Sequence, residues 1–136
     1  MPPLTREVLT SLPTSYFEAV DAKNLPAVLT HFAPNATITV QTARFTLTGA
    51  EEIHSMFSDY LSGSGQKEVK HVVTSVVVDE ERGKVATELD YYNENGVMHN
   101  CNFFEVGEDG KFTRVVIWME GESPLRGDWS CCSCLF

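Results

Sequence analysis

The sequence predicts an α+β fold in which helices come first and an antiparallel sheet follows. In the first half of the chain, apolar residues recur at steps of three and four, which is the period of an amphipathic helix. After the glycine- and serine-rich segment 62–65 the period changes to two, which is the period of a half-buried strand. The length of 136 residues and the 43% hydrophobic content are typical of one globular domain. We place this domain at residues 5–122.

Three helices are expected in the first half of the chain. The first covers residues 5–21, and Pro13 inside it is expected to kink it. The second covers residues 25–32, with Asn24 as a plausible N-cap. The third covers residues 50–61, where apolar residues form a stripe along one side.

Two short strands and four longer strands complete the predicted fold. The short strands, 36–41 and 44–48, lie between the second and third helices. Glycine and asparagine between the longer strands suit hairpin turns, which indicates an antiparallel meander. These longer strands are predicted at residues 69–79, 84–93, 97–106 and 111–120.

The charge of the chain limits its partners. Ten Lys and Arg against 19 Asp and Glu give 10 − 19 = −9, which repels the phosphates of nucleic acid. No run approaches the roughly 18 apolar residues of a membrane-spanning helix. The first residues also lack the basic region and apolar run of a secretory signal. We therefore expect a cytoplasmic protein that binds neither nucleic acid nor membrane.

Three of the four cysteines, Cys131, Cys132 and Cys134, crowd the last six residues. They have no partner pair at zinc spacing, so no metal site is expected. Prenylation requires a cysteine fourth from the end, where Ser133 stands. We interpret residues 123–136 as a mobile tail, with acylation of its cysteines as an alternative.

Five segments carry a family likeness: 16–25 (YFEAVDAKNL), 31–37 (HFAPNAT), 47–53 (LTGAEEI), 70–74 (KHVVT) and 85–88 (VATE). The first three resemble the NTF2-like superfamily, and the last two resemble its SnoaL-like branch. The resemblance implies a cone in which three N-terminal helices pack on a curved antiparallel sheet around a deep pocket. The superfamily includes ketosteroid isomerases, scytalone dehydratases, limonene epoxide hydrolases, polyketide cyclases and non-catalytic binding domains, so the fold alone leaves the function open.

The chemistry of the pocket depends on which face of predicted strand 84–93 points into it. Hydrophobicity alone would turn Val85 and Leu89 inward. Matching the Glu-Asn-Gly turn that follows to the ketosteroid isomerase pattern implies instead that Glu88 and Asp90 line the pocket. We adopt the register implied by the resemblance. It leaves an apolar outer face that needs a cover, so we expect a homodimer.

In this register Glu88 and Asp90 form a pair of carboxylates about 7 Å apart in a desolvated cavity. Two such groups should not both ionise readily, so one would hold a proton near neutral pH. The pair would then supply the donor and the acceptor that general acid–base catalysis needs. The alternative is a solvated strand face on an acidic protein.

The resemblance adds His71 and Asn102 to the catalytic set. His71 resembles a histidine of scytalone dehydratase, and an imidazole can take or give a proton near neutral pH. Asn102 stands where ketosteroid isomerases hold an acid that stabilises an oxyanion, and its amide could donate to a developing enolate. Asp21 matches an acidic position of scytalone dehydratase, although capping of a helix end explains an Asp there equally well.

The expected substrate-binding residues are Tyr16, Phe32, Val40, Phe57, Tyr92, Asn100, Phe104, Ile117 and Met119.

The resemblance implies a cofactor-free lyase or isomerase. It would catalyse dehydration, cyclisation or a double-bond shift on a small hydrophobic metabolite of polyketide or terpenoid type. Val40 stands where ketosteroid isomerases carry their base, which excludes that particular enzyme. The alternative is a non-catalytic ligand-binding or dimerisation module whose pocket is filled by its own side chains. Glu88 and Asp90 in bulk water would favour that alternative.

Overall fold

The computed structural model describes residues 4–63 and 68–120, so the predicted tail at 123–136 lies outside the described part. No helix in the described part is long and apolar enough to cross a bilayer. Its elements, in chain order, are α1 (Arg6–Asp21), α2 (Leu25–Leu29), β1 (Phe32–Val40), β2 (Phe45–Thr48), α3 (Gly49–Ser62), β3 (Lys70–Asp79), β4 (Lys84–Asn93), β5 (Gly96–Val106) and β6 (Phe112–Met119).

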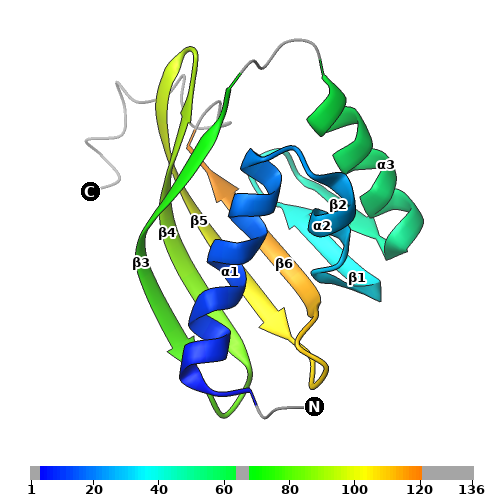
Figure 1. The fold of residues 1–136 in the computed structure, drawn as a ribbon, viewed down its shortest axis with the longest axis vertical. Helices are drawn as coiled ribbons and strands as arrows, with labels where there is room; N and C mark the ends of the chain where they lie inside the picture. Colours follow the sequence, from blue (N-terminus) through cyan, green and yellow to red (C-terminus); the bar gives the residue numbers. More distant parts are fainter. Residues whose placement is uncertain (1–3, 64–67, 121–136) are drawn as a thin grey trace, which may run out of the picture.

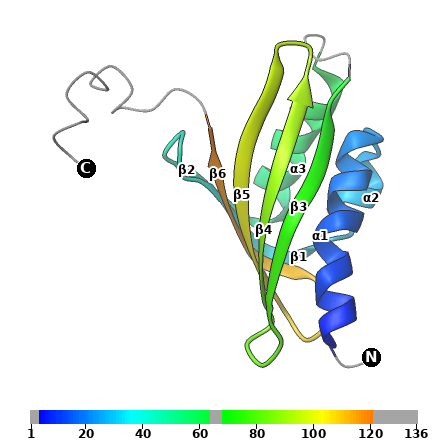
Figure 2. The same cartoon turned by 90° about the vertical axis from the view of Figure 1, so that its left-hand side faces the viewer.

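The strands form one curved sheet in the order β2-β1-β6-β5-β4-β3. Figure 1 looks onto this sheet with α1 crossing in front of it, and Figure 2 shows α1 and α2 together beside the strands. Helix α1 packs on β3 and β4, whereas α3 packs on β1 and β2 at the other end of the sheet. The core therefore lies between the helices and one face of the sheet.

Helix α1 presents a continuous apolar stripe to this core. Leu9, Tyr16, Phe17 and Val20 are all buried, at the spacing that one face of a helix requires. The side chain of Thr5 caps the helix by accepting a hydrogen bond from the Val8 backbone N–H at 3.2 Å. The helix extends through Pro13 as one element, so its last residue, Asp21, is fixed against the sheet.

The α+β class is confirmed, but the sheet is not purely antiparallel. β1 pairs with β6 in parallel, while every other pairing is antiparallel. The reason lies in the order of the elements. After the β1–β2 hairpin the chain passes through α3 and then runs through the antiparallel strands β3 to β6. The last of these, β6, lies beside β1 and runs in the same direction. The third helix therefore does not precede the strands. β1 also begins at Phe32 rather than residue 36, because α2 ends early at Leu29.

The predicted register of β4 is wrong. Val85 and Leu89 are buried against the helices, while Glu88 is exposed and Tyr92 is 45% exposed. The cause is the β4–β5 turn, which has only two loop residues because Asn93 pairs directly with Gly96. A three-residue turn would have shifted the pairing by one position, and a shift of one reverses every side chain of a strand.

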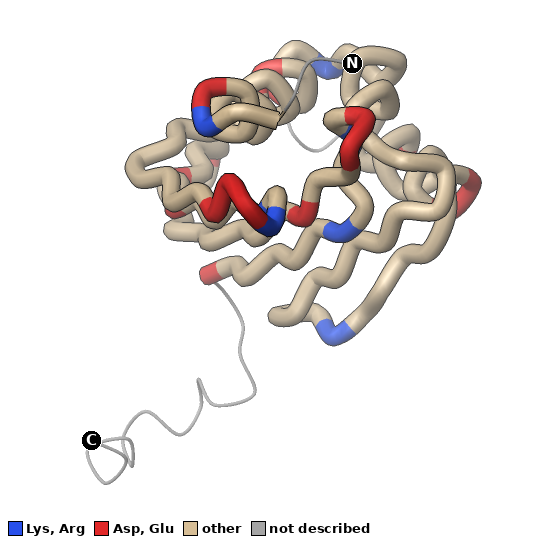
Figure 3. The backbone as a smooth tube through the Cα atoms, turned by 90° about the horizontal axis from the view of Figure 1, so that it is seen from below, with Lys and Arg blue, Asp and Glu red and all other residues tan. Residues whose placement is uncertain are grey.

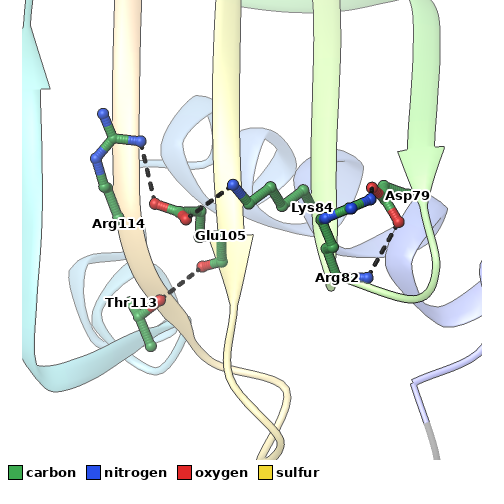
Figure 4. Close-up of polar contacts among 6 residues, drawn as sticks. All are labelled: Asp79, Arg82, Lys84, Glu105, Thr113 and Arg114. Carbon is green, nitrogen blue, oxygen red and sulfur yellow. Dashed lines mark hydrogen bonds and ion pairs between the residues drawn. The ribbon is translucent and has the colours of Figure 1, made fainter.

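The outer face of the sheet is apolar at its centre and charged at one end. Val77, Phe103 and Trp118 are 66%, 44% and 50% exposed there. Beside them, Figure 4 shows the Glu105 carboxylate between Lys84, at 3.4 Å, and Arg114, at 3.0 Å. Elsewhere the described backbone carries scattered acidic positions and fewer basic ones (Figure 3).

Candidate active site in the sheet cavity

A cavity of about 370 Å³ lies between α1, α3 and the inner face of the sheet. This volume falls within the range of small-molecule sites. Its wall is mostly aromatic and aliphatic, with one histidine, three tyrosines and three asparagines among its polar members. The lining residues are Tyr16, Phe17, Val20, Val40, Ala43, Phe45, Met56, Phe57, Tyr60, His71, Leu89, Tyr91, Asn93, Met98, Asn100, Asn102, Ile117 and Met119.

His71 is held at the cavity wall by Asp21. The Asp21 carboxylate accepts from the His71 backbone N–H at 2.8 Å and contacts Nδ1 of the ring at 2.6 Å. The two side chains are 11% and 21% exposed, so solvent screens the pair only weakly. Because Nδ1 is engaged by the carboxylate, Nε2 is the ring nitrogen left to exchange a proton with a ligand.

Two aromatic rings fix the plane of the His71 imidazole. Phe17 stacks on it with ring centroids 4.9 Å apart and planes 12° apart. The ring of Tyr91 lies at the same centroid distance with a tilt of 60°. Phe17 comes from α1, one turn before Asp21, so a single helix supplies both the stacking ring and the carboxylate.

A pair of tyrosines joins α3 to the sheet across the cavity. The hydroxyl oxygens of Tyr60 and Tyr91 lie 3.0 Å apart. Burial raises the pKa of Tyr60, and its hydrogen bond to Tyr91 and the charge of Asp21 raise that pKa further. Burial likewise raises the pKa of Tyr16. Both phenols therefore stay protonated near neutral pH and can act as hydrogen-bond donors.

Asn100 and Asn102 bring amide groups to the β5 wall of the cavity. The side-chain oxygen of Asn100 accepts from the Glu120 backbone N–H at 3.3 Å. Asn102 is only 4% exposed, and its Oδ1 is buried without a hydrogen-bond partner in the described part of the chain. An unpaired buried amide oxygen is costly, and such groups cluster at functional sites.

The structure brings together only part of the predicted catalytic set. His71 and Asn102 line the cavity, whereas Glu88 and Asp90 do not. Asp90 instead contacts Nδ1 of the exposed His99 at 2.6 Å, on the outer face. The carboxylate pair expected in the cavity is therefore absent from it, because the register of β4 is the opposite of the one adopted.

The predicted binding residues are mostly placed in the wall. Phe32 and Phe104 belong to the core without lining the cavity, and Tyr92 faces outward. The other six predicted residues line the cavity: Tyr16, Val40, Phe57, Asn100, Ile117 and Met119.

Sequence reasoning overlooked Phe17, Tyr60 and Tyr91 as site residues. The inward hydrophobic alternation of β4 could have identified Tyr91, since it shares a face with Val85 and Leu89. The stripe of α3 could likewise have identified Tyr60, which lies one turn after Met56 and Phe57. No signal of comparable strength marks Phe17 as the ring that stacks on a histidine.

Solved structures share this fold at low sequence identity. AusH from Aspergillus nidulans has a TM-score of 0.74 and 16% identity, with 90% of this chain and 89% of that chain covered. PrhC from Penicillium brasilianum has a TM-score of 0.72 and 16% identity, over 85% and 82% of the two chains. At such identities the likeness shows the fold alone.

A third similar structure is SalBIII, described as an epoxide hydrolase/cyclase-like enzyme in pyran ring formation in the polyether salinomycin. It has a TM-score of 0.71 and 16% identity, over 85% of this chain and 93% of that one. Comparison with curated protein sequences gave no match. The model of the SnoaL-like domain matches residues 14–115, which is most of the chain and nearly all of the described fold. The chain belongs to the SnoaL-like family.

Proposed function

We propose that this protein is a cofactor-free general acid–base lyase or isomerase that acts on a small, largely apolar metabolite of polyketide or terpenoid type. The observation that carries the proposal is the Asp21–His71 pair, fixed at the wall of an apolar cavity. Dehydration, cyclisation and double-bond migration share one first step, the removal of a proton next to a carbonyl group. The proposal covers these three reactions as one class.

His71 would act as the catalytic base and then as the acid. Nε2 takes a proton from the carbon next to a substrate carbonyl, and the electron pair of the broken C–H bond moves onto the carbonyl oxygen. Asn102 and the Tyr16 hydroxyl are the groups in the wall that could donate to that oxygen. The imidazolium then returns its proton to one of three places: a leaving hydroxyl, which departs as water in dehydration; another carbon, in a double-bond shift; or the alkoxide that forms when the enolate carbon attacks a second carbonyl and closes a ring. The negative charge of the Asp21 carboxylate stabilises the imidazolium.

The proposal can be tested without knowing the natural substrate. Incubation with 2-tetralone in D₂O, followed by NMR, measures deuterium uptake next to the carbonyl, which is the shared first step. We expect the wild-type protein to accelerate the exchange and His71→Ala to lower the rate by about 10²-fold or more. Asp21→Asn should lower it less and change its pH profile, because the carboxylate positions the imidazole without touching the substrate.

Two matched controls separate the site from general effects. His54 is an exposed histidine of α3 outside the cavity wall, so His54→Ala should keep full exchange. Asp90→Asn should also keep it, since Asp90 lies outside the cavity. Circular dichroism confirms that each variant is folded. Exchange that is undiminished in folded His71→Ala would refute the assignment.

A non-catalytic ligand-binding module is the second candidate. The exterior position of Glu88 favours it, because the cavity then contains only one acid–base pair. Binding of neutral apolar probes without deuterium exchange on any ketone tested would support this candidate over the enzyme.

We also propose that the protein is a homodimer that pairs through the outer face of its sheet. The exposed Val77, Phe103 and Trp118 support this, because monomers rarely leave large apolar side chains grouped in water. At one end of this patch the charged residues Asp79, Lys84, Glu105 and Arg114 are two of each sign. This balanced end limits the repulsion between two copies of a chain with a net charge of −9.

A further inference from the structure

Within the described part of the chain, the residues that line the cavity include no lysine, arginine or carboxylate. Of the residues that line it, only His71 and three tyrosines can ionise, and no lysine, arginine, aspartate or glutamate is among them. Its other polar members are asparagine amides. A ligand that carries a carboxylate or a phosphate would lose its water shell in the cavity, and burying a charge without a partner is costly.

The carboxylate of Asp21, which contacts His71, prevents this part of the cavity from acquiring a net positive charge. With a neutral imidazole, the Asp21–His71 pair carries a charge of −1. With a protonated imidazole, the two charges cancel and the pair carries none. The field of Asp21 also reaches the opposite wall, since this charge contributes to the raised pKa of Tyr60 on α3.

Among the described residues that line the cavity, no lysine or arginine stands beside the Asp21–His71 pair. The charged neighbours along the chain, Lys23 after α1 and Glu68 and Lys70 at the start of β3, have exposed side chains and do not line the wall. Tyr91 from β4 and Tyr60 from α3 face the pair as neutral phenols. Asp21 is thus a charged group in direct contact with the histidine that lines the cavity.

We infer that Asp21 is a selectivity residue that restricts the cavity to uncharged ligands and excludes carboxylates and phosphates of the same size. The inference rests on the proposed use of the cavity as a small-molecule site and names the charge class of its ligand. The ligand is an apolar molecule whose oxygens are hydroxyl, carbonyl, ether or ester groups. A free acid, an acyl phosphate or a coenzyme A thioester would not place its anionic group here.

Displacement of a neutral fluorescent dye tests this selectivity. N-phenyl-1-naphthylamine fluoresces in apolar pockets, and two competitors of the same ring size, 2-naphthol and 2-naphthoate, differ in charge. At about pH 7 we expect wild-type protein to bind 2-naphthol at least about tenfold more tightly than 2-naphthoate.

Asp21→Asn separates the role of the charge from that of the cavity shape. The negative charge beside His71 is then lost, so the affinity for 2-naphthoate should rise about tenfold at about pH 7. Glu18→Gln is the matched control, since it removes one negative charge from the exposed side of the same helix. It should leave both affinities unchanged.

A second variant adds the missing cation. Met56 lies in the α3 wall and is half-buried, so Met56→Lys places an ammonium at the cavity. It should raise 2-naphthoate affinity across the whole pH range, even if Asp21→Asn fails to fold. Two outcomes would overturn this inference without affecting the proposed function. In the first, the wild type binds the two competitors equally. In the second, a folded variant shows no gain in 2-naphthoate binding. If the wild type binds neither dye nor competitor, the proposed function fails with it.

Discussion

At the scale of single residues, the site combines a hydrogen-bonded polar pair, Asp21 and His71, with one buried amide oxygen that has no hydrogen-bond partner in the described part of the chain. His71 receives a hydrogen-bond partner at Nδ1 and rings at two of its sides, which fix its position before any ligand arrives. Asn102 is buried, but its Oδ1 has no partner in the described part of the chain. This contrast separates a pair that stabilises the fold from an amide oxygen whose burial without a partner costs stability.

Asn102→Leu should therefore separate stability from function. Because the buried Oδ1 of Asn102 has no partner, its removal is expected to leave the free energy of unfolding unchanged or to raise it by about 1 kcal/mol. The same substitution should lower ketone exchange, because the donor to the substrate oxygen is lost. Urea denaturation and deuterium exchange on one preparation measure both effects.

Asn100→Leu is the matched comparison for this prediction. It leaves the Glu120 N–H without the amide oxygen that accepts from it at 3.3 Å, so it should destabilise the protein. If Asn102→Leu destabilises as much as Asn100→Leu, the Asn102 amide is a structural group and its role in catalysis is wrong.

The outer-face contact of His99 with Asp90 should make stability depend on pH. The hydrogen bond to Asp90 and the charge of Asp90 raise the pKa of His99 above 6.5. A raised pKa in the folded state means that the contact stabilises the protein below about pH 6.5, and that this contribution is lost as pH rises through the raised value. Asp90→Asn should thus lower the Tm near pH 6 and have no effect near pH 9.

The measurement for this contact is the difference in Tm between wild type and Asp90→Asn across that pH range. His99→Gln is the complementary variant and should show the same trend. A difference that grows with rising pH would have the wrong sign and would contradict the contact.

At the scale of elements, the β4–β5 hairpin determines which chemistry reaches the cavity. Its two-residue turn pairs Leu89 with Asn100, and Thr87 with Asn102, so these four side chains share the inner face. Glu88 and Asp90 are consequently on the outer face. A turn longer by one residue would place carboxylates where Leu89 and Tyr91 now lie.

Gly96 is the residue that permits this turn. It has a φ of +124°, and a Cβ added there would have nothing within 4 Å. Gly96→Ala should therefore cost about 1–2 kcal/mol of stability from backbone strain alone, with no steric clash. Urea denaturation measures the change.

Asn95→Ala is the control for the turn. Asn95 is in the same turn but is not among the residues of positive φ, and its side chain is exposed. It should change stability by less than about 0.5 kcal/mol. Equal effects of the two substitutions would mean that the glycine conformation does not limit the hairpin.

The sequence predicted the elements far better than it predicted the site. Helical and strand periods gave every helix and strand to within a few residues, because they depend on local burial. The inward face of β4 depended on one residue of turn length, which periodicity does not determine. Hydrophobic alternation alone was right for Val85 and Leu89, and matching to another enzyme's turn was wrong.

The Asp21–His71 contact shows a second limit. The two residues are 50 positions apart, and the helix end and strand start that carry them meet only through packing of α1 on β3. The resemblance marked both positions, but helix capping explained Asp21 equally well in the sequence. Only the fold shows that its carboxylate points to an imidazole.

At the scale of the whole molecule, one face of the sheet is covered by helices and the other is not. The uncovered face carries the exposed Val77, Phe103 and Trp118, on a chain whose net charge of −9 otherwise opposes self-association. A two-fold dimer would bury the same patch on both copies, and stable interfaces cover about 800 Å² per partner. The ion pairs of Glu105 with Lys84 and Arg114 would lie at the edge of such an interface.

Sedimentation at micromolar concentration should therefore give about twice the chain mass of 15.1 kDa. Trp118→Glu places a charge in the middle of the patch, and combined with Val77→Glu it should give a folded monomer. Phe45→Glu changes a residue of similar exposure on β2, away from this face, and should remain dimeric. Because the cavity lies on the opposite side of the sheet, the monomeric variant should still bind the neutral dye. A wild type that sediments as a monomer would show that the apolar face serves another partner.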